Sequence, residues 1–345
     1  MKETLTDANF PRTADLRVYH LGLRPGEVAN RIITVGSPSR AQAIATFLDE
    51  SPKPFVLSSE RGFLTITGRY KTVPISIISI GMGSPNMDFF VREVRECLKG
   101  DMSVVRLGSC GALVDVPVGT VVIPKASVAV SRNVDFDFLH PADSKELPYR
   151  ISKPAYADPA LYLEVKKSLE ALKPVGSHNT ILSGTVNASA DSFYSSQGRH
   201  TSFPDHNADL IEKLQASTPD LATLEMETFH LYHLAACWSG GRVTSKVAEP
   251  PLATGPVRPV ISVPSSNSES IIPPPSLQLA SPDTVIRAAA AQMVFASRTS
   301  QDFITPQHVS ELERWTGLGV LNALKNFETP VDRLHPEKGS VWEIL

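Results

Sequence analysis

The stretch RIITVGSPSR at residues 31–40 has a pattern that recurs along the chain. Its first five residues form a run rich in β-branched side chains, which is typical of a buried strand. Gly36 and Pro38 follow, and the spacing of apolar residues over 39–48 predicts an amphipathic helix. The stretch therefore predicts a strand, a glycine turn and a helix in succession.

The same order returns further along the chain. Residues 63–70 and 73–80 are predicted strands, and the second continues through GMGSPN into a helix that ends near Lys99. Residues 103–107 form a third apolar strand, followed by a glycine turn at 108–111. Strands that alternate with helices predict an α/β sheet whose loops at the carboxyl edge line a crevice.

Further elements are predicted in the second half of the chain. They are a loop-rich region at 136–160, a helix at 159–172, two strands within 175–187, a helix at 225–237 and a helix capped by Thr305 that continues to Phe327. The apolar run at 287–297 fits a strand or a helix equally, because its period does not separate the two. Residues 239–283 are rich in Pro and Ser and lack helical periodicity, so we expect a mostly disordered surface insertion. A flexible arm at 1–15 and a tail at 328–345 are expected to flank a single domain at 16–327.

Composition and charge limit the classes of function. The chain of 345 residues has 33 Lys and Arg against 36 Asp and Glu, which gives a net charge of −3. That balance predicts no general attraction to nucleic acid or to a membrane surface, so an anion site must be built from individually placed arginines. The 3 scattered cysteines fit a reducing compartment, and the N-terminus has no apolar run. We therefore expect a cytoplasmic protein without a membrane span.

Residues 187–199, NASADSFYSSQGR, contain groups suited to binding a flat heterocycle. Phe193 and Tyr194 offer aromatic faces for stacking. Gln197 offers a donor and an acceptor side by side, and Arg199 offers donors in a planar fork. The stretch therefore indicates a site that stacks on a heterocycle and reads its edge. The alternative is a polar loop anchored by its aromatic residues.

Three arginines indicate an anion site. Arg40 follows a glycine turn at a helix N-terminus, where backbone N–H groups favour anions. Arg61 precedes a strand, and Arg106 lies in the apolar run SVVRLG shortly before the Ser109 hydroxyl. Together these groups could hold a phosphate dianion through charge-assisted hydrogen bonds. A solvated surface charge is the alternative for Arg40 and Arg61, whereas an unpaired charge in an apolar run is costly, so the position of Arg106 favours a bound anion or partner.

Other candidate residues stand outside these two groups. Glu225 and Glu227 flank Met226 at a predicted helix start, where Glu227 could accept hydrogen bonds from a vicinal diol and Met226 could pack on a sugar face. The alternative is that both glutamates only complement the helix dipole. His20 lies in VYHLGL, where a structural role is the alternative, and Arg298 follows the late apolar run.

Seven motifs occur in order along the chain. They are VYHLGL (18–23), VGSPSR (35–40), GMGSP (81–85), RLGSCGAL (106–113), SADSFYSSQGR (189–199), LEMET (224–228) and ASRTSQ (296–301). In this order they resemble the nucleoside phosphorylase I family, most closely its uridine-cleaving members, over roughly residues 16–238 and 287–326. The resemblance implies a single α/β domain whose central sheet is mixed, twisted and partly barrel-like and is flanked by helices.

The resemblance also implies roles for individual residues. Phosphate would be bound by Gly36, Arg40, Arg106 and Ser109, together with Arg61 of a neighbouring subunit. Ribose would be bound by Met226, Glu227 and Ser109, together with His20 of a neighbouring subunit. The base would be bound by Phe193, Gln197, Arg199 and Arg298. The catalytic residues would be Arg199, Gln197 and Arg106. Such shared sites imply a homodimer or a hexamer.

The reaction that the resemblance implies is reversible phosphorolysis of uridine to uracil and ribose 1-phosphate. Inorganic phosphate would be the co-substrate, and no organic cofactor is expected. Purine-cleaving relatives have Asp in the motif that holds Ser297 and Arg298 here, and they lack the Gln-x-Arg pair, which favours a pyrimidine. Gly62 stands where bacterial relatives have a potassium-binding Glu, so no metal is expected. Ser109 stands where those relatives usually have Thr, and the hydroxyl is kept.

Several other functions stay open at this point. A nucleosidase of the same fold would use water instead of phosphate, a broader phosphorylase would also accept purine nucleosides, and a nucleoside-binding homologue would bind without turnover. A dinucleotide-dependent oxidoreductase is disfavoured, because no loop matches the pattern GxGxxG.

Overall fold

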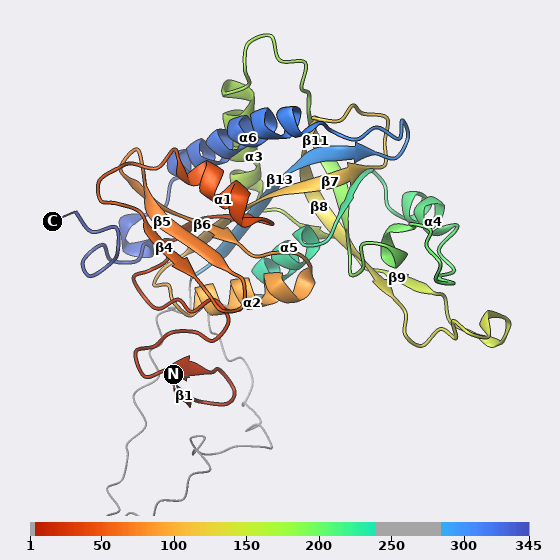
Figure 1. Ribbon diagram of the computed structural model, residues 1–345, viewed down its shortest axis with the longest axis horizontal. Coiled ribbons are helices and arrows are strands. Elements are labelled where there is room, and N and C mark those ends of the chain that lie inside the picture. Colours follow the sequence, from red (N-terminus) through yellow and green to blue (C-terminus); the bar gives the residue numbers. More distant parts are fainter. Residues whose placement is uncertain (1–3, 239–283, 345) are drawn as a thin grey trace, which may run out of the picture.

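The computed structural model describes residues 4–238 and 284–344. Within these ranges the chain forms one mixed α/β domain (Figure 1), as predicted. The insertion predicted at 239–283 lies outside the described residues.

The strands and helices have the following bounds. The strands are β1 (Leu5–Thr6), β2 (Arg12–Thr13), β3 (Arg31–Val35), β4 (Phe55–Ser58), β5 (Leu64–Tyr70), β6 (Val73–Ser79), β7 (Met102–Ala112), β8 (Val121–Arg132), β9 (Tyr149–Ile151), β10 (Ala155–Tyr156), β11 (Ile181–Ala190), β12 (Leu221–Glu225) and β13 (Ile286–Ser297). The α-helices are α1 (Pro38–Ala45), α2 (Ser84–Arg95), α3 (Pro159–Ala171), α4 (Leu210–Ser217), α5 (Thr228–Cys237) and α6 (Pro306–Asn326). Short 3₁₀ helices are η1 (Pro141–Asp143), η2 (Ser195–Gln197) and η3 (Val331–Arg333).

The central sheet is mixed. In the described residues it has 11 strands, in the order β10-β8-β11-β12-β7-β3-β6-β5-β4, with β9 paired to β8. β13 pairs in parallel with β7 and antiparallel with β8, so β7, β12, β11, β8 and β13 close a ring of strands. β3 is parallel to both β6 and β7. The carboxyl ends of these three parallel strands therefore meet at one edge, where ligand sites of α/β sheets form.

The opening stretch folds as its pattern predicts. β3 is buried along its whole length, and α1 begins at Pro38. The Ser37 hydroxyl caps this helix by accepting a hydrogen bond from the backbone N–H of Arg40 at 3.3 Å. Proline suits the first turn, because its missing N–H would have no helical partner there. β5, β6, α3 and α6 likewise agree with the prediction to within a residue, and α2 is present but ends at Arg95, four residues before the predicted end near Lys99.

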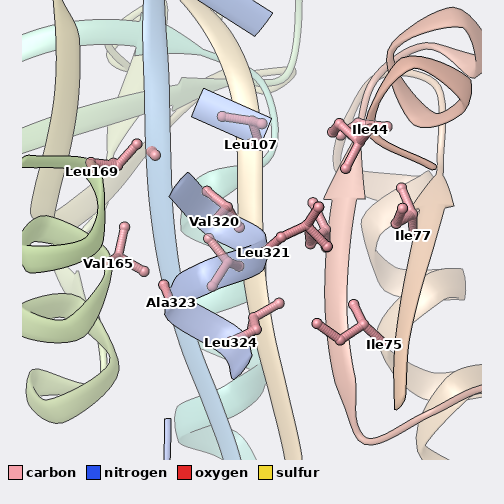
Figure 2. Close-up of a cluster of buried hydrophobic side chains, with 14 of the residues drawn as sticks. Ile44, Ile75, Ile77, Leu107, Val165, Leu169, Val320, Leu321, Ala323 and Leu324 are labelled. Atoms are coloured by element: carbon pink, nitrogen blue, oxygen red, sulfur yellow. The ribbon is translucent and has the colours of Figure 1, made fainter. Parts of the chain in front are cut away.

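Helices cover both faces of the sheet. α1, α3 and α6 pack on one face, and α2 and α5 on the other (Figure 1). Figure 2 shows the first core, in which Ile44 of α1 lies near Ile77 of β6, Leu321 of α6 lies in the middle of the cluster, and Leu169 of α3 lies on its opposite side. Each fully buried side chain of this size contributes about 1.5–3 kcal/mol. Gly319 of α6 permits a close approach to α3, since a Cβ there would lie 2.6 Å from Leu169 Cδ2.

Two predicted boundaries are wrong because long-range pairing overrides local pattern. The glycine turn expected at 108–111 belongs to β7, which continues to Ala112 because β13 pairs with it along its whole length. The two strands expected within 175–187 are one strand, β11, which pairs in parallel with β8 and β12. These additional pairings supply the backbone hydrogen bonds that a glycine turn or a hairpin would otherwise provide.

The helix expected from Glu225 begins three residues later. Glu225 is the last residue of β12 and still pairs with Ser189 of β11, and α5 begins at Thr228.

The run at 287–297, whose pattern fits a strand or a helix, is a strand, β13. β12 and α4 were not predicted. The predicted tail packs on the domain through Trp342, which is 1% exposed.

Candidate active site

A cavity of about 340 Å³ lies where β3, β7, β12 and β13 end. It brings together nine residues predicted as site residues, namely Gly36, Arg40, Arg106, Ser109, Phe193, Gln197, Arg199, Met226 and Glu227. The sequence analysis did not assign a site role to the remaining lining residues, which are Ser37, Met82, Cys110, Gly111, Leu224, Glu225, Phe295, Ala296 and Phe303. Residues distant in sequence therefore form a single site.

Two buried arginines form one part of this cavity. Arg40 is 6% exposed and Arg106 is 4% exposed. Gly36 lies beside this part of the cavity, since a Cβ built there would lie at an ordinary contact distance of 3.8 Å from Arg106 Nη2. Arg40 Nε donates to Glu313 Oε1 at 2.7 Å. Burial lowers the pKa of Arg40, Glu313 opposes that shift, and the nearby charge of Arg106 adds to it.

Arg106 has unused hydrogen-bonding capacity. Its Nη2 donates to Glu227 Oε2 at 2.6 Å. Its Nε and Nη1 are buried and have no hydrogen-bond partner among the described residues. A buried donor without a partner costs about 1–3 kcal/mol, and more when it is charged. An anion in the cavity beside Arg40 and Arg106 would remove that cost, so the unpaired nitrogens of Arg106 indicate a ligand at this position.

Glu227 and Glu225 are both buried in the wall of the cavity. Glu227 Oε1 accepts a hydrogen bond from the backbone N–H of Gly83 at 2.6 Å, at the start of α2. Glu225 accepts from the backbone N–H of Glu227 at 2.8 Å, from Asn187 Nδ2 at 2.7 Å and from the Ser189 hydroxyl. Burial raises the pKa of Glu225, and the charge of Glu227 raises it further. The two glutamates are thus fixed parts of the cavity wall, and they do more than complement the dipole of α5.

Phe193, Gln197 and Arg199 form the part of the cavity suited to a planar ring. The Arg199 guanidinium lies 4.1 Å from the centre of the Phe193 ring, and its Nη2 is 3.5 Å from Gln197 Oε1. Arg199 Nε is buried without a partner among the described residues. Burial lowers the pKa of Arg199. Tyr194 is 57% exposed and meets Phe193 edge-on outside the cavity lining.

Arg298 contacts the site through Gln197 and does not line the cavity. Its Nη2 donates to the backbone carbonyl of Gln197 at 2.7 Å. Gly198 follows with a φ of 62°, a conformation that favours glycine. A Cβ there would also lie 2.9 Å from Ile211 Cγ1. Arg298 and Gly198 together fix the backbone that presents Gln197 and Arg199.

His20 and Arg61 do not reach the cavity of their own chain. His20 Nδ1 donates to Glu93 Oε1 at 2.6 Å. Arg61 is exposed, and its Nη2 donates to the Tyr19 hydroxyl at 2.6 Å. The structure therefore groups these two predicted site residues with each other, away from the other nine. The cavity of another subunit is where the family resemblance expects them.

In the ranges 4–238 and 284–344, no group of three or more His, Cys, Asp and Glu side chains has an arrangement that could hold a metal ion. Among those same residues, no helix is both long enough and apolar enough to cross a bilayer.

The sequence profile of the Phosphorylase superfamily matches residues 30–239. A uridine phosphorylase of Thermococcus kodakarensis is 32% identical over 240 residues, which cover 68% of this chain and 78% of that protein. A DeoD-type purine nucleoside phosphorylase of Oceanobacillus iheyensis is 31% identical over 219 residues, which cover 63% of this chain and 80% of that protein.

Two solved structures share the fold. A chain from work on two uridine phosphorylases of the oomycete Phytophthora capsici is 36% identical, with a TM-score of 0.76, and covers 94% of this chain and 100% of its own. A Trypanosoma brucei nucleoside phosphorylase, described as showing uridine phosphorylase activity, is 19% identical with a TM-score of 0.66. The match covers 92% of this chain and 100% of the trypanosomal one, and at that identity it supports the fold alone.

Proposed function

This chain belongs to the Phosphorylase superfamily, and from that premise we propose that it is a uridine phosphorylase. The reaction is the reversible phosphorolysis of uridine to uracil and ribose 1-phosphate. The observation that carries the proposal is the buried Arg106, whose Nε and Nη1 lack partners in the described part of the chain while its Nη2 holds Glu227. A phosphate would satisfy those donors next to the groups suited to a nucleoside.

Phosphate is proposed to bind between Arg40 and Arg106. Both guanidiniums are buried and offer planar arrays of donors, which suit bidentate contacts with phosphate oxygens. The Gly36 backbone and the Ser109 hydroxyl line the same part of the cavity. A dianion there would offset the repulsion between two like charges held close together in a medium of low polarity.

The nucleoside is proposed to lie between Phe193 and the two glutamates. Phe193 would stack on the base, and Gln197 with Arg199 would contact the carbonyl and N–H groups of the uracil edge. Glu227 would accept hydrogen bonds from the ribose hydroxyls, and Met226 would pack on the sugar. A nucleoside in this position spans the cavity from the base pocket to Arg106.

The chemistry follows from how charge moves. Breaking the C1′–N1 bond leaves positive charge on the ribose and negative charge on the departing uracil. Phosphate held by Arg40 and Arg106 would offset the charge on the sugar and take up the position for attack at C1′. Arg199, whose buried Nε has no partner among the described residues, would stabilise the uracil anion with Gln197. These steps require no covalent nucleophile in the protein and no organic cofactor.

A second copy of the chain is proposed to complete each site. His20 and Arg61 would reach the cavity of the neighbouring subunit, His20 at the ribose 5′-hydroxyl and Arg61 at the phosphate. Neither residue lines the cavity of its own chain, and both are held by hydrogen bonds elsewhere, which supports this arrangement. A homodimer, or a hexamer built from such dimers, would bring these residues to the neighbouring cavity.

The buried state of the free thiols of Cys97 and Cys110 supports a reducing compartment, for which we propose the cytoplasm.

The DeoD-type relatives support a second candidate function, a phosphorylase that also accepts purine nucleosides. Both are tested by incubating the protein with uridine, thymidine, inosine or adenosine, with and without phosphate, and measuring the free base. Phosphate-dependent release of uracil as the fastest reaction is expected. Inosine as the fastest substrate would overturn the pyrimidine assignment. Uracil release without phosphate would identify a nucleosidase, and uridine binding without turnover at millimolar phosphate would identify a binding protein.

A further inference from the structure

Glu93 is a buried carboxylate on α2 whose side-chain hydrogen bonds, in the part of the chain that the structure describes, come from His20 and Leu21. Its side chain is 7% exposed. Oε1 accepts a hydrogen bond from His20 Nδ1 at 2.6 Å, and Oε2 accepts one from the backbone N–H of Leu21 at 2.8 Å. The backbone N–H of His20 lies 3.0 Å from Oε1 and 3.1 Å from Oε2. One carboxylate thus fixes both the backbone and the ring of His20.

The ring is held on a second side by stacking. Phe89 lies one turn before Glu93 on α2, and its ring centre is 3.8 Å from that of His20, with 14° between the planes. Because Nδ1 donates to the carboxylate, the neutral ring carries its proton on Nδ1 and keeps Nε2 as an acceptor. No other hydrogen bond to the His20 ring occurs among the described residues. The side chain is 26% exposed, so Nε2 remains available to a ligand.

The position of this pair excludes the cavity of its own chain as the target. Gly83, at the start of α2, touches the cavity wall through Glu227. Glu93 lies ten residues further along the helix, about 15 Å away at a rise of 1.5 Å per residue. The nearby Arg61 is exposed and is held by Tyr19, so the surface around His20 carries two fixed groups that do not line the cavity of their own chain.

We propose that Glu93 is a positioning residue for catalysis, which holds His20 so that Nε2 accepts the hydrogen bond of the ribose 5′-hydroxyl of a nucleoside bound in a second copy of the chain. This inference rests on the proposed function and deepens it. Glu93 touches neither substrate nor the reacting atoms, and its whole effect passes through His20. A substrate that lacks the 5′-hydroxyl should therefore not respond to the loss of Glu93.

The test compares Glu93→Gln with the wild type on uridine and on 5′-deoxyuridine. The amide has one acceptor oxygen instead of two, so it cannot accept from both Nδ1 and Leu21. The expected loss in kcat/KM is about tenfold for uridine and less than about twofold for 5′-deoxyuridine. Glu96→Gln is the matched control, because Glu96 is the C-cap residue of the same helix, is 41% exposed and pairs with Arg12. In a His20→Asn background, Glu93→Gln should cost less than about twofold on uridine.

If Glu93→Gln lowers kcat/KM equally on the two substrates, or lowers it about tenfold in the His20→Asn background as well, its role is merely structural and the inference is overturned. If Glu93→Gln does not fold, ¹⁵N NMR of the histidine rings in the wild type decides, with His20→Asn used for assignment. At alkaline pH, where imidazole is neutral, the proton is expected on Nδ1 of His20. A proton on Nε2 would overturn the inference. Absence of any uridine phosphorolysis by the wild type would instead overturn the proposed function, so the two failures are distinguishable.

Discussion

Arg106 and Glu227 form a buried ion pair in the wall of the cavity. Nη2 of Arg106 lies 2.6 Å from Oε2 of Glu227, and the two side chains are 4% and 5% exposed. The other carboxylate oxygen of Glu227 accepts from Gly83, so the arginine is held by a group that is itself fixed to α2. The pair joins the proposed phosphate position to the proposed ribose position, which makes the geometry of one depend on the other.

Removing Glu227 should destabilise the fold as well as the site. Glu227→Ala leaves the Arg106 charge buried without its partner, and we expect the free energy of unfolding to fall by about 3–5 kcal/mol. Denaturant unfolding measures it. The control is Asp220→Asn, which breaks the exposed pair with Lys125 and should cost less than about 1 kcal/mol. A loss of only that size for Glu227→Ala would show that water replaces the carboxylate around Arg106.

Removing Arg199 should slow the chemical step more than it weakens binding. Arg199→Ala takes away the guanidinium that lies beside Phe193 and Gln197, where negative charge would develop on uracil. We expect kcat for uridine to fall by about 10²–10³, with a smaller rise in KM. Steady-state kinetics of Arg150→Ala, at an exposed arginine on β9, provide the control. A rise in KM with unchanged kcat would mean that Arg199 binds the base without stabilising the leaving group.

Local sequence pattern was sufficient wherever neighbouring residues decide the structure. The run 31–40 encodes its own strand, cap and helix, because the β-branched residues, Ser37 and Pro38 act within a few positions of one another. Arg106 is identifiable from the sequence, because a charge in an apolar run must meet a partner or a ligand. The structure gives it one partner, Glu227, and leaves two of its nitrogens unpaired in the described residues.

Features that depend on distant segments were not predictable from the sequence. The glycines at 108–111 look like a turn, and only pairing with β13, far along the chain, makes them strand. Glu225 has the same local appearance as Glu227, yet its acceptors are filled by Asn187 and Ser189 of another strand. Phe303 lines the cavity from a loop with no motif, and Glu93 is one charge among several on its helix.

Tyr19 should act on phosphate binding through Arg61. Its hydroxyl accepts a hydrogen bond from Arg61 Nη2 at 2.6 Å, and the Arg61 guanidinium also lies 5.1 Å from the centre of the ring. Tyr19→Phe keeps the ring contact and removes the hydrogen bond. If Arg61 binds phosphate in the neighbouring subunit, KM for phosphate should rise about threefold to tenfold while kcat stays within about twofold. Phosphate titrations of Tyr156→Phe, at an exposed tyrosine on β10, give the control. An unchanged KM would contradict this role.

The stability of the protein should depend on pH through His230. Burial lowers the pKa of His230, the nearby His233 adds to that shift, and Asp88 and Glu227 oppose it. Its Nδ1 is buried without a partner in the described part of the chain. Between the lowered value and the ordinary value of 6.5, the unfolded chain binds more protons at this residue than the folded chain does. The contribution of neutral His230 to the free energy of unfolding is therefore fully present above the ordinary histidine pKa and is lost as the pH falls below that value.

His230→Asn should remove that contribution. In urea unfolding followed from about pH 8 to about pH 5.5, the free energy of unfolding of the wild type is expected to decline relative to the variant only below the ordinary histidine pKa. His178→Asn, at an exposed histidine, is the matched substitution and controls for the change of residue type. A wild-type minus variant difference that stays constant across this range, or that grows in favour of the wild type as the pH falls, would show that the folded state accommodates a charged His230 beside Asp88.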